Sequence, residues 1–89
     1  MQGQGTRRPG MGPEHRALGR AVRELRARQG LSQEEMGFAC DLHRNYIGAL
    51  ERAEVSPTLR TLLRLMRGLA LPLSALVEVY ERQLADAER

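Results

Sequence analysis

Hydrophobic residues recur at helical spacing along most of the chain, with polar residues between them. Leu18, Val22 and Leu25 form one stripe, arginines lie away from it, and Gly30 offers an end. The pattern predicts a first helix from Glu14 to Gln29. No alternating pattern typical of a strand is found, so the sequence predicts an all-α fold.

A second helix is predicted to begin after Ser32. Glu35 stands three residues later, which is the spacing of a capping box, in which each side chain bonds the other's backbone N–H. This helix should run to about Cys40 and break at residues 41–43. A third helix is then expected from Arg44 to about Arg52. Two short helices joined by so tight a turn must cross steeply.

Two further helices are expected in the second half of the chain. Pro57 followed by Thr58 marks the start of the fourth, and Pro72 separates it from a fifth that begins at about Leu73. The fourth is apolar over much of its circumference, which predicts a central position in the fold. The stripe of the fifth helix is formed by Leu73, Leu76, Val77, Tyr80 and Leu84.

A chain of 89 residues with 42% hydrophobic residues suffices for one domain with one core. Residues 1–13 contain four glycines, two prolines, Arg7 and Arg8 and almost nothing apolar, so a disordered basic arm is expected. Residues 14–78 are expected to form the helical domain. Residues 79–89 are expected to extend the fifth helix and to offer a possible dimer contact.

Positive charge is concentrated near the N-terminus. The net charge is +3, but residues 1–28 hold seven arginines against Glu14 and Glu24, which gives +5 there and −2 elsewhere. Such a distribution suits a chain that presents a basic end to a polyanion, and it also suits an ordinary solvated face. The sequence contains no 18-residue apolar run and no signal peptide, so a cytoplasmic location and no membrane contact are expected.

Little in the sequence suggests catalysis or metal binding. Cys40 is the single cysteine and no cluster of histidines or cysteines surrounds it, so neither a disulfide nor a metal site is expected. No nucleophile and base converge in the pattern, so the chain is not expected to be an enzyme. No cofactor is predicted.

The third helix has one face that suits DNA. At about 100° per residue, Ile47 and Leu50 point to the core. The opposite face is polar at its N-terminal end, where arginine and asparagine are the residues that read guanine and adenine in a major groove. The alternative is an ordinary solvated face. The outward residues are Arg44, Asn45, Gly48, Ala49 and Arg52.

The turn before this helix has the residues that a helix-turn-helix needs. Asp41 can adopt a left-handed backbone, Leu42 can act as an apolar plug, and Gly37 offers a small residue where the two helices meet.

Several short motifs then follow in order: Gly30-Leu31-Ser32-Gln33-Glu34-Glu35-Met36, Tyr46-Ile47, Leu50-Glu51-Arg52, Ser56-Pro57-Thr58-Leu59 and Leu71-Pro72-Leu73-Ser74. Through them, residues 16–77 resemble the Xre family of phage-repressor and Cro-like regulators. The resemblance implies a five-helix lambda-repressor-like domain with a helix-turn-helix. It also implies a sequence-specific transcriptional regulator of double-stranded DNA, a homodimeric repressor that reads a pseudo-palindromic operator through the major groove.

The resemblance also implies roles for particular residues. Arg44, Asn45 and Ala49 would face bases, and Gly48 would allow close approach of the helix to DNA. An ion pair between Arg26 and Glu51 would orient the third helix. The residues expected near phosphates are Gln33, His43, Tyr46 and Arg52, with Gln33 also steadying Arg44. Their alternatives are a polar first-turn residue for Gln33, a surface histidine for His43 and a ring at the core edge for Tyr46.

Three features depart from the family pattern. Asp41 stands where the turn usually has glycine, Ala53 follows the Leu50-Glu51-Arg52 motif where the family usually has glycine, and Phe38 occupies an ordinarily polar, exposed position. Phe38 and the C-terminal extension keep a second function open, an antitoxin-type DNA-binding protein that also binds a protein partner.

A dimer contact is predicted on the fifth helix at Leu76, Val79 and Tyr80. Its stripe is longer than a small core can cover, and Val79 points off it, so apolar area should remain exposed for a two-fold mate. The competing interpretation is that the stripe folds wholly onto the first and fourth helices, with Val79 a lone exposed residue.

Overall fold

The computed structural model describes residues 12–88, which form five helices and no strand. The predicted all-α fold with five helices is therefore confirmed for this part of the chain. Most of the expected basic arm, residues 1–11, lies outside the described residues, and Pro13 at its end is already the first residue of a helix. In order, the helices are α1 (Pro13–Arg28), α2 (Gln33–Cys40), α3 (Arg44–Glu51), α4 (Leu59–Leu69) and α5 (Leu73–Ala87).

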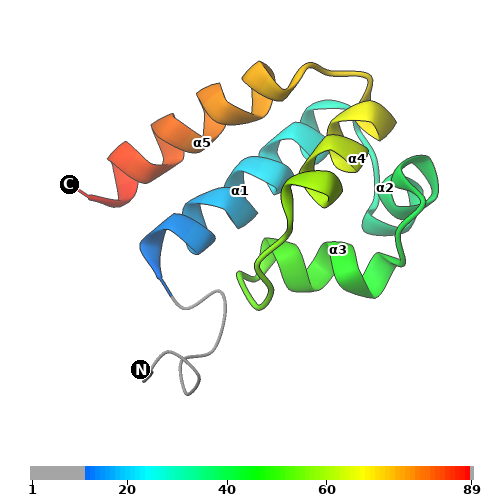
Figure 1. Cartoon of the computed structure of the whole chain (residues 1–89), viewed down its shortest axis with the longest axis horizontal. Coiled ribbons are helices and arrows are strands. Elements are labelled where there is room, and N and C mark those ends of the chain that lie inside the picture. The colour runs from blue at the N-terminus through cyan, green and yellow to red at the C-terminus, as the bar shows by residue number, and fades with distance from the viewer. Residues whose placement is uncertain (1–11, 89) are drawn as a thin grey trace.

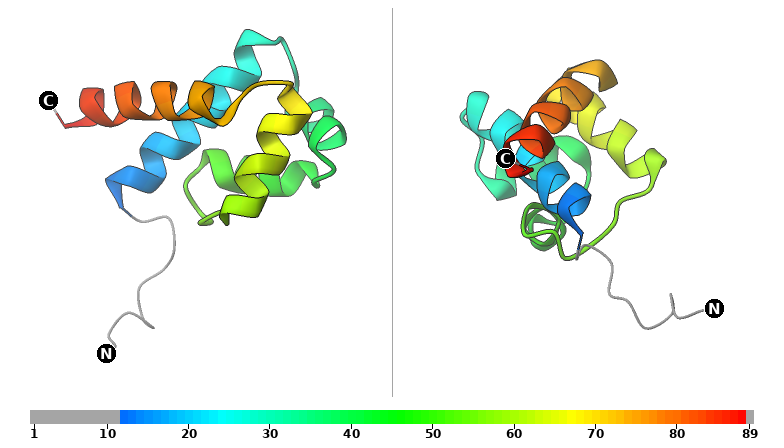
Figure 2. Two further views of the ribbon diagram at one scale, coloured as in Figure 1. Left: turned by 45° about the horizontal axis from the view of Figure 1, so that its top comes forward. Right: turned by 90° about the vertical axis from the view of Figure 1, so that its left-hand side faces the viewer.

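The two longest helices, α1 and α5, lie side by side (Figure 1). The shorter helices α2, α3 and α4 gather toward the C-terminal half of α1. Two further views show α3 beneath α1 and α5 running on past the short helices (Figure 2). Helix α1 packs against both α3 and α5, whereas α4 packs mainly against α2 and has Leu59 and Leu63 exposed. The predicted central position of α4 is thus wrong, because α1 supplies the surface on which both halves of the fold rest.

Local signals set the ends of α2 as predicted. Ser32 Oγ accepts from the Glu35 N–H at 3.0 Å, and Glu35 Oε1 accepts from the Ser32 N–H at 2.8 Å, which completes the capping box. Asp41 ends the helix in the left-handed region with φ of 58°. A Cβ on Gly37 would strike the backbone oxygen of Leu42, so the turn can close only over a residue without a side chain.

The core combines residues from all five helices. Gly19 brings α1 close to the C-terminal end of α3, since a Cβ there would lie 2.7 Å from the carbonyl oxygens of Leu50 and Glu51. The buried cluster consists of Ala21, Val22, Leu25, Met36, Cys40, Ile47, Leu50, Leu65, Met66, Leu69, Leu76 and Val79.

The predicted dimer contact on α5 needs correction. Leu76 is 2% exposed and Val79 is 1% exposed, so both belong to the core of a single chain and neither is available to a partner. Residues three apart share a face of a helix, and the face that carries these two side chains is turned inward. Tyr80 is half-buried and packs at the edge of the core, and Val77 is the residue of this helix left 43% exposed.

Within residues 12–88, no helix has the length and apolar content needed to cross a membrane. Among the same residues, no group of three or more His, Cys, Asp or Glu side chains is arranged to hold a metal ion.

Candidate nucleic-acid interface

The N-terminal end of α3 is polar and open. His43 caps this helix, with its Nδ1 accepting from the Asn45 backbone N–H at 2.9 Å. A nitrogen that accepts carries no hydrogen, so the neutral ring carries its proton on Nε2 and can donate from that side. His43, Arg44 and Asn45 are all exposed. The capping bond fixes the first turn of α3 while leaving the side chains of Arg44 and Asn45 outside it.

Arg44 has a neighbour of opposite charge on α2. Its Nη1 lies 3.6 Å from Glu34 Oε1, and the two side chains are 61% and 65% exposed. An ion pair this long and this exposed contributes little to stability. The guanidinium can therefore leave Glu34 for another acceptor at small cost.

The middle of the α3 face differs from the prediction. Gly48 is buried and Ala49 is half-buried. A Cβ on Gly48 would lie 3.0 Å from Arg52 Nη1 and 3.3 Å from Gln33 Oε1. The expected open approach of Gly48 to DNA is wrong, because the side chains of Gln33 and Arg52 cross over this glycine.

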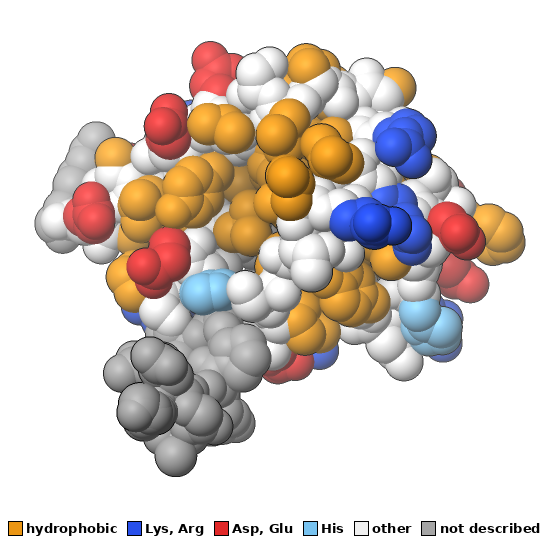
Figure 3. Space-filling model, viewed as in Figure 1, with side chains coloured by type: hydrophobic (Ala, Val, Ile, Leu, Met, Phe, Trp, Pro, Cys, Tyr) orange, Lys and Arg blue, Asp and Glu red, His pale blue; other side chains and the backbone are white. Residues whose placement is uncertain are grey.

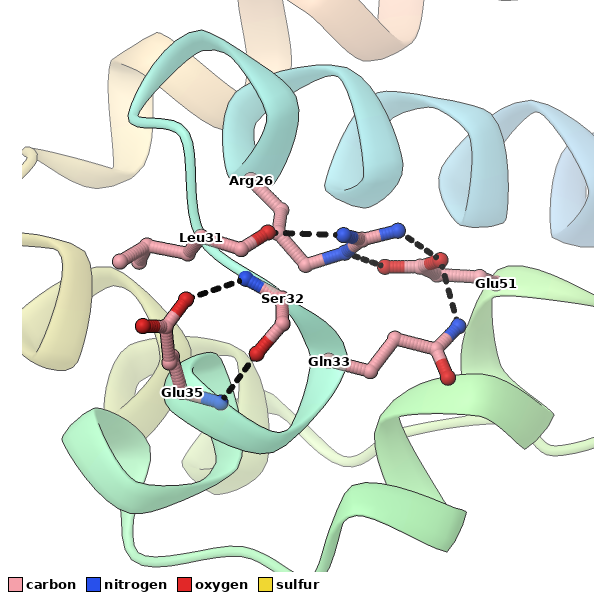
Figure 4. Close-up of polar contacts among 6 residues, drawn as sticks. All are labelled: Arg26, Leu31, Ser32, Gln33, Glu35 and Glu51. Carbon is pink, nitrogen blue, oxygen red and sulfur yellow. Dashed lines mark hydrogen bonds and ion pairs between the residues drawn. The ribbon is translucent and has the colours of Figure 1, made fainter.

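A buried ion pair joins α1 to the end of α3, at the positions that the sequence predicts (Figure 4). Arg26 Nε donates to Glu51 Oε2 at 2.6 Å and Nη2 donates to Oε1 at 2.9 Å, while Nη1 donates to the Leu31 carbonyl at 2.8 Å. The hydrogen bonds to Glu51 raise the pKa of Arg26. Since the Glu51 side chain is only 5% exposed, this pair fixes how α3 sits on α1.

Gln33 takes part in the same network. Its Nε2 donates to Glu51 Oε1 at 3.1 Å, so the carboxylate accepts from both Arg26 and Gln33 (Figure 4). An ionised carboxylate only accepts, which fixes the orientation of the Gln33 amide. The carbonyl oxygen of Gln33 is consequently turned away from Glu51 and toward Gly48.

Arg52 lies at the other end of α3. Its Nε and Nη2 donate to the two oxygens of Glu54 at 2.9 and 3.2 Å, and both side chains are more than half exposed. These hydrogen bonds raise the pKa of Arg52 and lower the pKa of Glu54. Sequence reasoning missed this partner of Arg52. Arg52 and Glu54 have one residue between them and lie just past the end of α3, so the spacing rules for neighbours within a helix do not apply to them.

The remaining predicted contact residue is Tyr46. It is half-buried and its ring packs against the core cluster, which agrees with the alternative of a ring at the core edge.

Sequence reasoning also passed over a basic group on α4, where arginines three or four positions apart share an exposed face with Leu59 and Leu63. Figure 3 shows basic side chains gathered on this side of the molecule. The arginines are Arg60, Arg64 and Arg67.

Comparisons with known proteins identify the family and the fold. A helix-turn-helix family model matches residues 22–76. Control protein C.BamHI of Bacillus amyloliquefaciens is 34% identical over 55 residues, which are 61% of this chain and 68% of that protein. Control protein C.SmaI of Serratia marcescens is 44% identical over 52 residues, or 58% of this chain and 62% of that protein, so the chain spans less than two thirds of this second relative.

Solved structures show the same fold. The restriction-modification controller protein C.AhdI from Aeromonas hydrophila superposes with a TM-score of 0.71 at 34% identity, over 73% of this chain and 98% of that one. The C.Esp1396I controller-protein tetramer, solved in complex with its natural 35 base-pair operator, superposes with a TM-score of 0.76 at 22% identity, over 81% of this chain and 95% of that one. The chain belongs to the Xre-like helix-turn-helix family.

Proposed function

We propose that the chain is a sequence-specific DNA-binding transcriptional regulator that acts as a homodimeric repressor. The observation that carries the proposal is the exposed pair Arg44 and Asn45 on the first turn of α3, a helix that a buried ion pair holds on α1. A major groove admits a helix, and these residue types read guanine and adenine there. The relatives are named control proteins, which supports a regulatory role, and one neighbour in fold was solved in complex with its operator.

In this proposal Arg44, Asn45 and Ala49 face base edges. His43, with Nε2 free to donate, lies at the phosphate backbone together with Gln33, Arg52 and the hydroxyl of Tyr46. Phosphate contacts place the protein on the duplex and base contacts give the preference.

The test begins with selection of bound DNA from a random pool, which supplies the preferred site. Arg44→Ala and Asn45→Ala should each weaken binding to that site by about 1–3 kcal/mol and relax the preference at one position, with little change on a scrambled duplex. Arg23→Ala is the matched control, because it removes the same charge from an exposed position on α1. Parent-like affinity and preference in both α3 variants would refute the assignment.

The sign of regulation has its own measurement. The selected site is placed over the start of a reporter gene, and the output is compared with and without the chain. A repressor lowers the output, and an increase would show an activator.

The homodimer needs a surface other than the buried face of α5. A shallow apolar hollow lies where the N-terminal end of α1, the 56–57 loop, α4 and α5 meet. Figure 3 shows hydrophobic side chains gathered here between acidic ones, next to a histidine. Burial of this area against a two-fold mate would remove it from water. Its apolar lining includes Leu18, Pro57, Leu62, Leu73, Val77 and Tyr80.

Val77→Asp tests this surface, since Val77 is 43% exposed and a charge there leaves the core of the single chain intact. The variant should sediment as a folded monomer and bind the selected site more weakly. Glu78→Arg is a control that should remain dimeric, because Glu78 is exposed and lies about 100° around α5 from Val77, outside the lining of the hollow. A parent-like dimer of Val77→Asp would place the interface elsewhere.

A protein partner is the second candidate function, and Phe38 favours it. The ring is 87% exposed on α2 beside Glu34 and Asp41. Phe38→Gln should keep the DNA affinity of the purified chain and change the reporter output in cells if a partner covers this ring. Unchanged output would leave Phe38 as a solvated apolar residue.

A further inference from the structure

Gly48 is the buried glycine whose surroundings differ from those of the others. A Cβ on Gly19 or Gly37 would meet backbone atoms first, so a side chain at either position would act on the fold. A Cβ on Gly48 would instead meet the ends of two side chains, Gln33 and Arg52. These two side chains come from different elements, one from the start of α2 and one from the end of α3.

We infer that Gly48 is a positioning residue for DNA binding: its missing side chain leaves a slot in which the Gln33 amide, through the second hydrogen of Nε2, and the Arg52 guanidinium are held ready to donate to phosphate. The inference rests on the proposed function. It replaces the role expected from the sequence, in which Gly48 itself approaches the bases.

Both occupants of the slot are tethered at their far ends. Gln33 Nε2 donates to Glu51 Oε1 at 3.1 Å, and the Glu51 carboxylate is in turn fixed by Arg26. Arg52 is held by the two oxygens of Glu54. A methyl group on Gly48 lies closer to Nη1 and Oε1 than ordinary contact permits, so both groups must shift by a few tenths of an ångström. The shift strains the bond between Gln33 and the buried Glu51 carboxylate, and it moves the Arg52 guanidinium, whose exposed pair with Glu54 resists displacement only weakly, out of its place.

The same geometry predicts that the fold survives the change. The atoms that must move are the ends of flexible side chains, and no backbone atom is among the nearest three. Alanine is also favoured over glycine within a helix by about 1 kcal/mol. Gly48→Ala should therefore melt at the parental temperature or above it, and its effect should fall on binding.

The experiment measures the affinity of Gly48→Ala, in the full chain, for the selected site and for a scrambled duplex over a range of salt concentrations. The expected result is a loss of about tenfold on both duplexes, the order of one charge-assisted hydrogen bond. The slope of log affinity against log salt should become shallower by up to about 0.9 per chain as the Arg52 contact is lost. The base preference recovered by selection should stay as in the parent.

A cycle of variants shows whether the effect passes through the two side chains. In the background Gln33→Ala with Arg52→Ala, the added methyl at Gly48 should change the affinity no further. In the background Arg44→Ala, which does not contact the slot, Gly48→Ala should keep its full tenfold effect. Circular dichroism on every variant checks that each is folded.

Two results would overturn the inference. Loss of affinity for the selected site alone, with the scrambled duplex unaffected, would mean that the surface at Gly48 faces bases. Parental affinity of Gly48→Ala on both duplexes would mean that the slot positions nothing. Failure of the proposed function is distinct, because in that case the parent chain itself would select no sequence from the pool.

Discussion

The Glu51 carboxylate is the group whose removal most sharply tests how α3 is held. It accepts from Arg26 Nε and Nη2 and from Gln33 Nε2, and its side chain is 5% exposed. Glu51→Gln keeps the shape but removes the charge, and its amide group points hydrogens at donors that need an acceptor. The Arg26 guanidinium is then left largely buried without a counter-charge, and its remaining acceptors are the Leu31 carbonyl and the single oxygen of the introduced amide.

Breaking a buried ion pair from one side costs about 3–5 kcal/mol. Arg26 retains the Leu31 carbonyl and its side chain is 16% exposed, so water can reach part of it and we expect about 2–3 kcal/mol for Glu51→Gln. In a domain of this size each kcal/mol lowers the melting temperature by roughly 4–8 °C. The melting temperature should therefore fall by about 10–20 °C.

Urea unfolding followed by circular dichroism measures this cost. Glu54→Gln is the matched control, since it breaks an exposed pair with Arg52 and should change the free energy of unfolding little. A double variant, Arg26→Met with Glu51→Leu, should recover most of the lost stability, because no charge is left buried. A cost below about 0.5 kcal/mol for Glu51→Gln would refute the reasoning.

Two further predictions concern α5. Val79→Ala should lower the free energy of unfolding by about 2 kcal/mol, because it removes fully buried carbon atoms and leaves a cavity, while Val77→Ala should cost well under 1 kcal/mol; equal costs in urea unfolding would show that the two faces of α5 are misassigned. The hydrogen bond from Arg82, with a smaller contribution from Gln83, lowers the pKa of Glu24 from an ordinary 4.5 to about 2. The stability that this carboxylate contributes is therefore present above pH 4.5 and is lost as the pH falls toward 2. The Glu24 side chain is 24% exposed and screened, so we expect about 1 kcal/mol, and Glu24→Gln should be less stable than the parent at pH 5 and equal to it near pH 2.

The helices could be predicted from the sequence because their signals are local. Spacing of apolar residues predicts α1, the Ser32 and Glu35 pair predicts the start of α2, and Asp41 supplies the left-handed residue that ends it. Each of these depends on residues within one or two turns of each other. The predicted ion pair of Arg26 with Glu51 came instead from resemblance to a family, since the two residues are 25 positions apart.

The wrong predictions depended on contacts between distant segments. Val79 lies three residues from Leu76 and shares its face, but which face of α5 turns inward is decided by how α1 lies beside it. Gly48 is covered by Gln33, which is fifteen positions earlier and whose amide is held by Glu51. The spacing of apolar residues along α3 predicts that residue 48 points outward. It contains no information about a side chain of another helix that covers this position.

The ion pairs around α3 divide by burial, and the division matches what the proposed function requires. The pair that sets the position of the helix, Arg26 with Glu51, is nearly excluded from water and does not depend on DNA. The two arginines at the ends of α3, Arg44 and Arg52, pair with Glu34 and Glu54 in the open, where such pairs contribute little to stability. A phosphate or a guanine can take either guanidinium from its carboxylate at that small cost, and the helix does not have to move when it does. On the proposed function, DNA binding would exchange partners at the surface of α3 and leave the support of the helix unchanged.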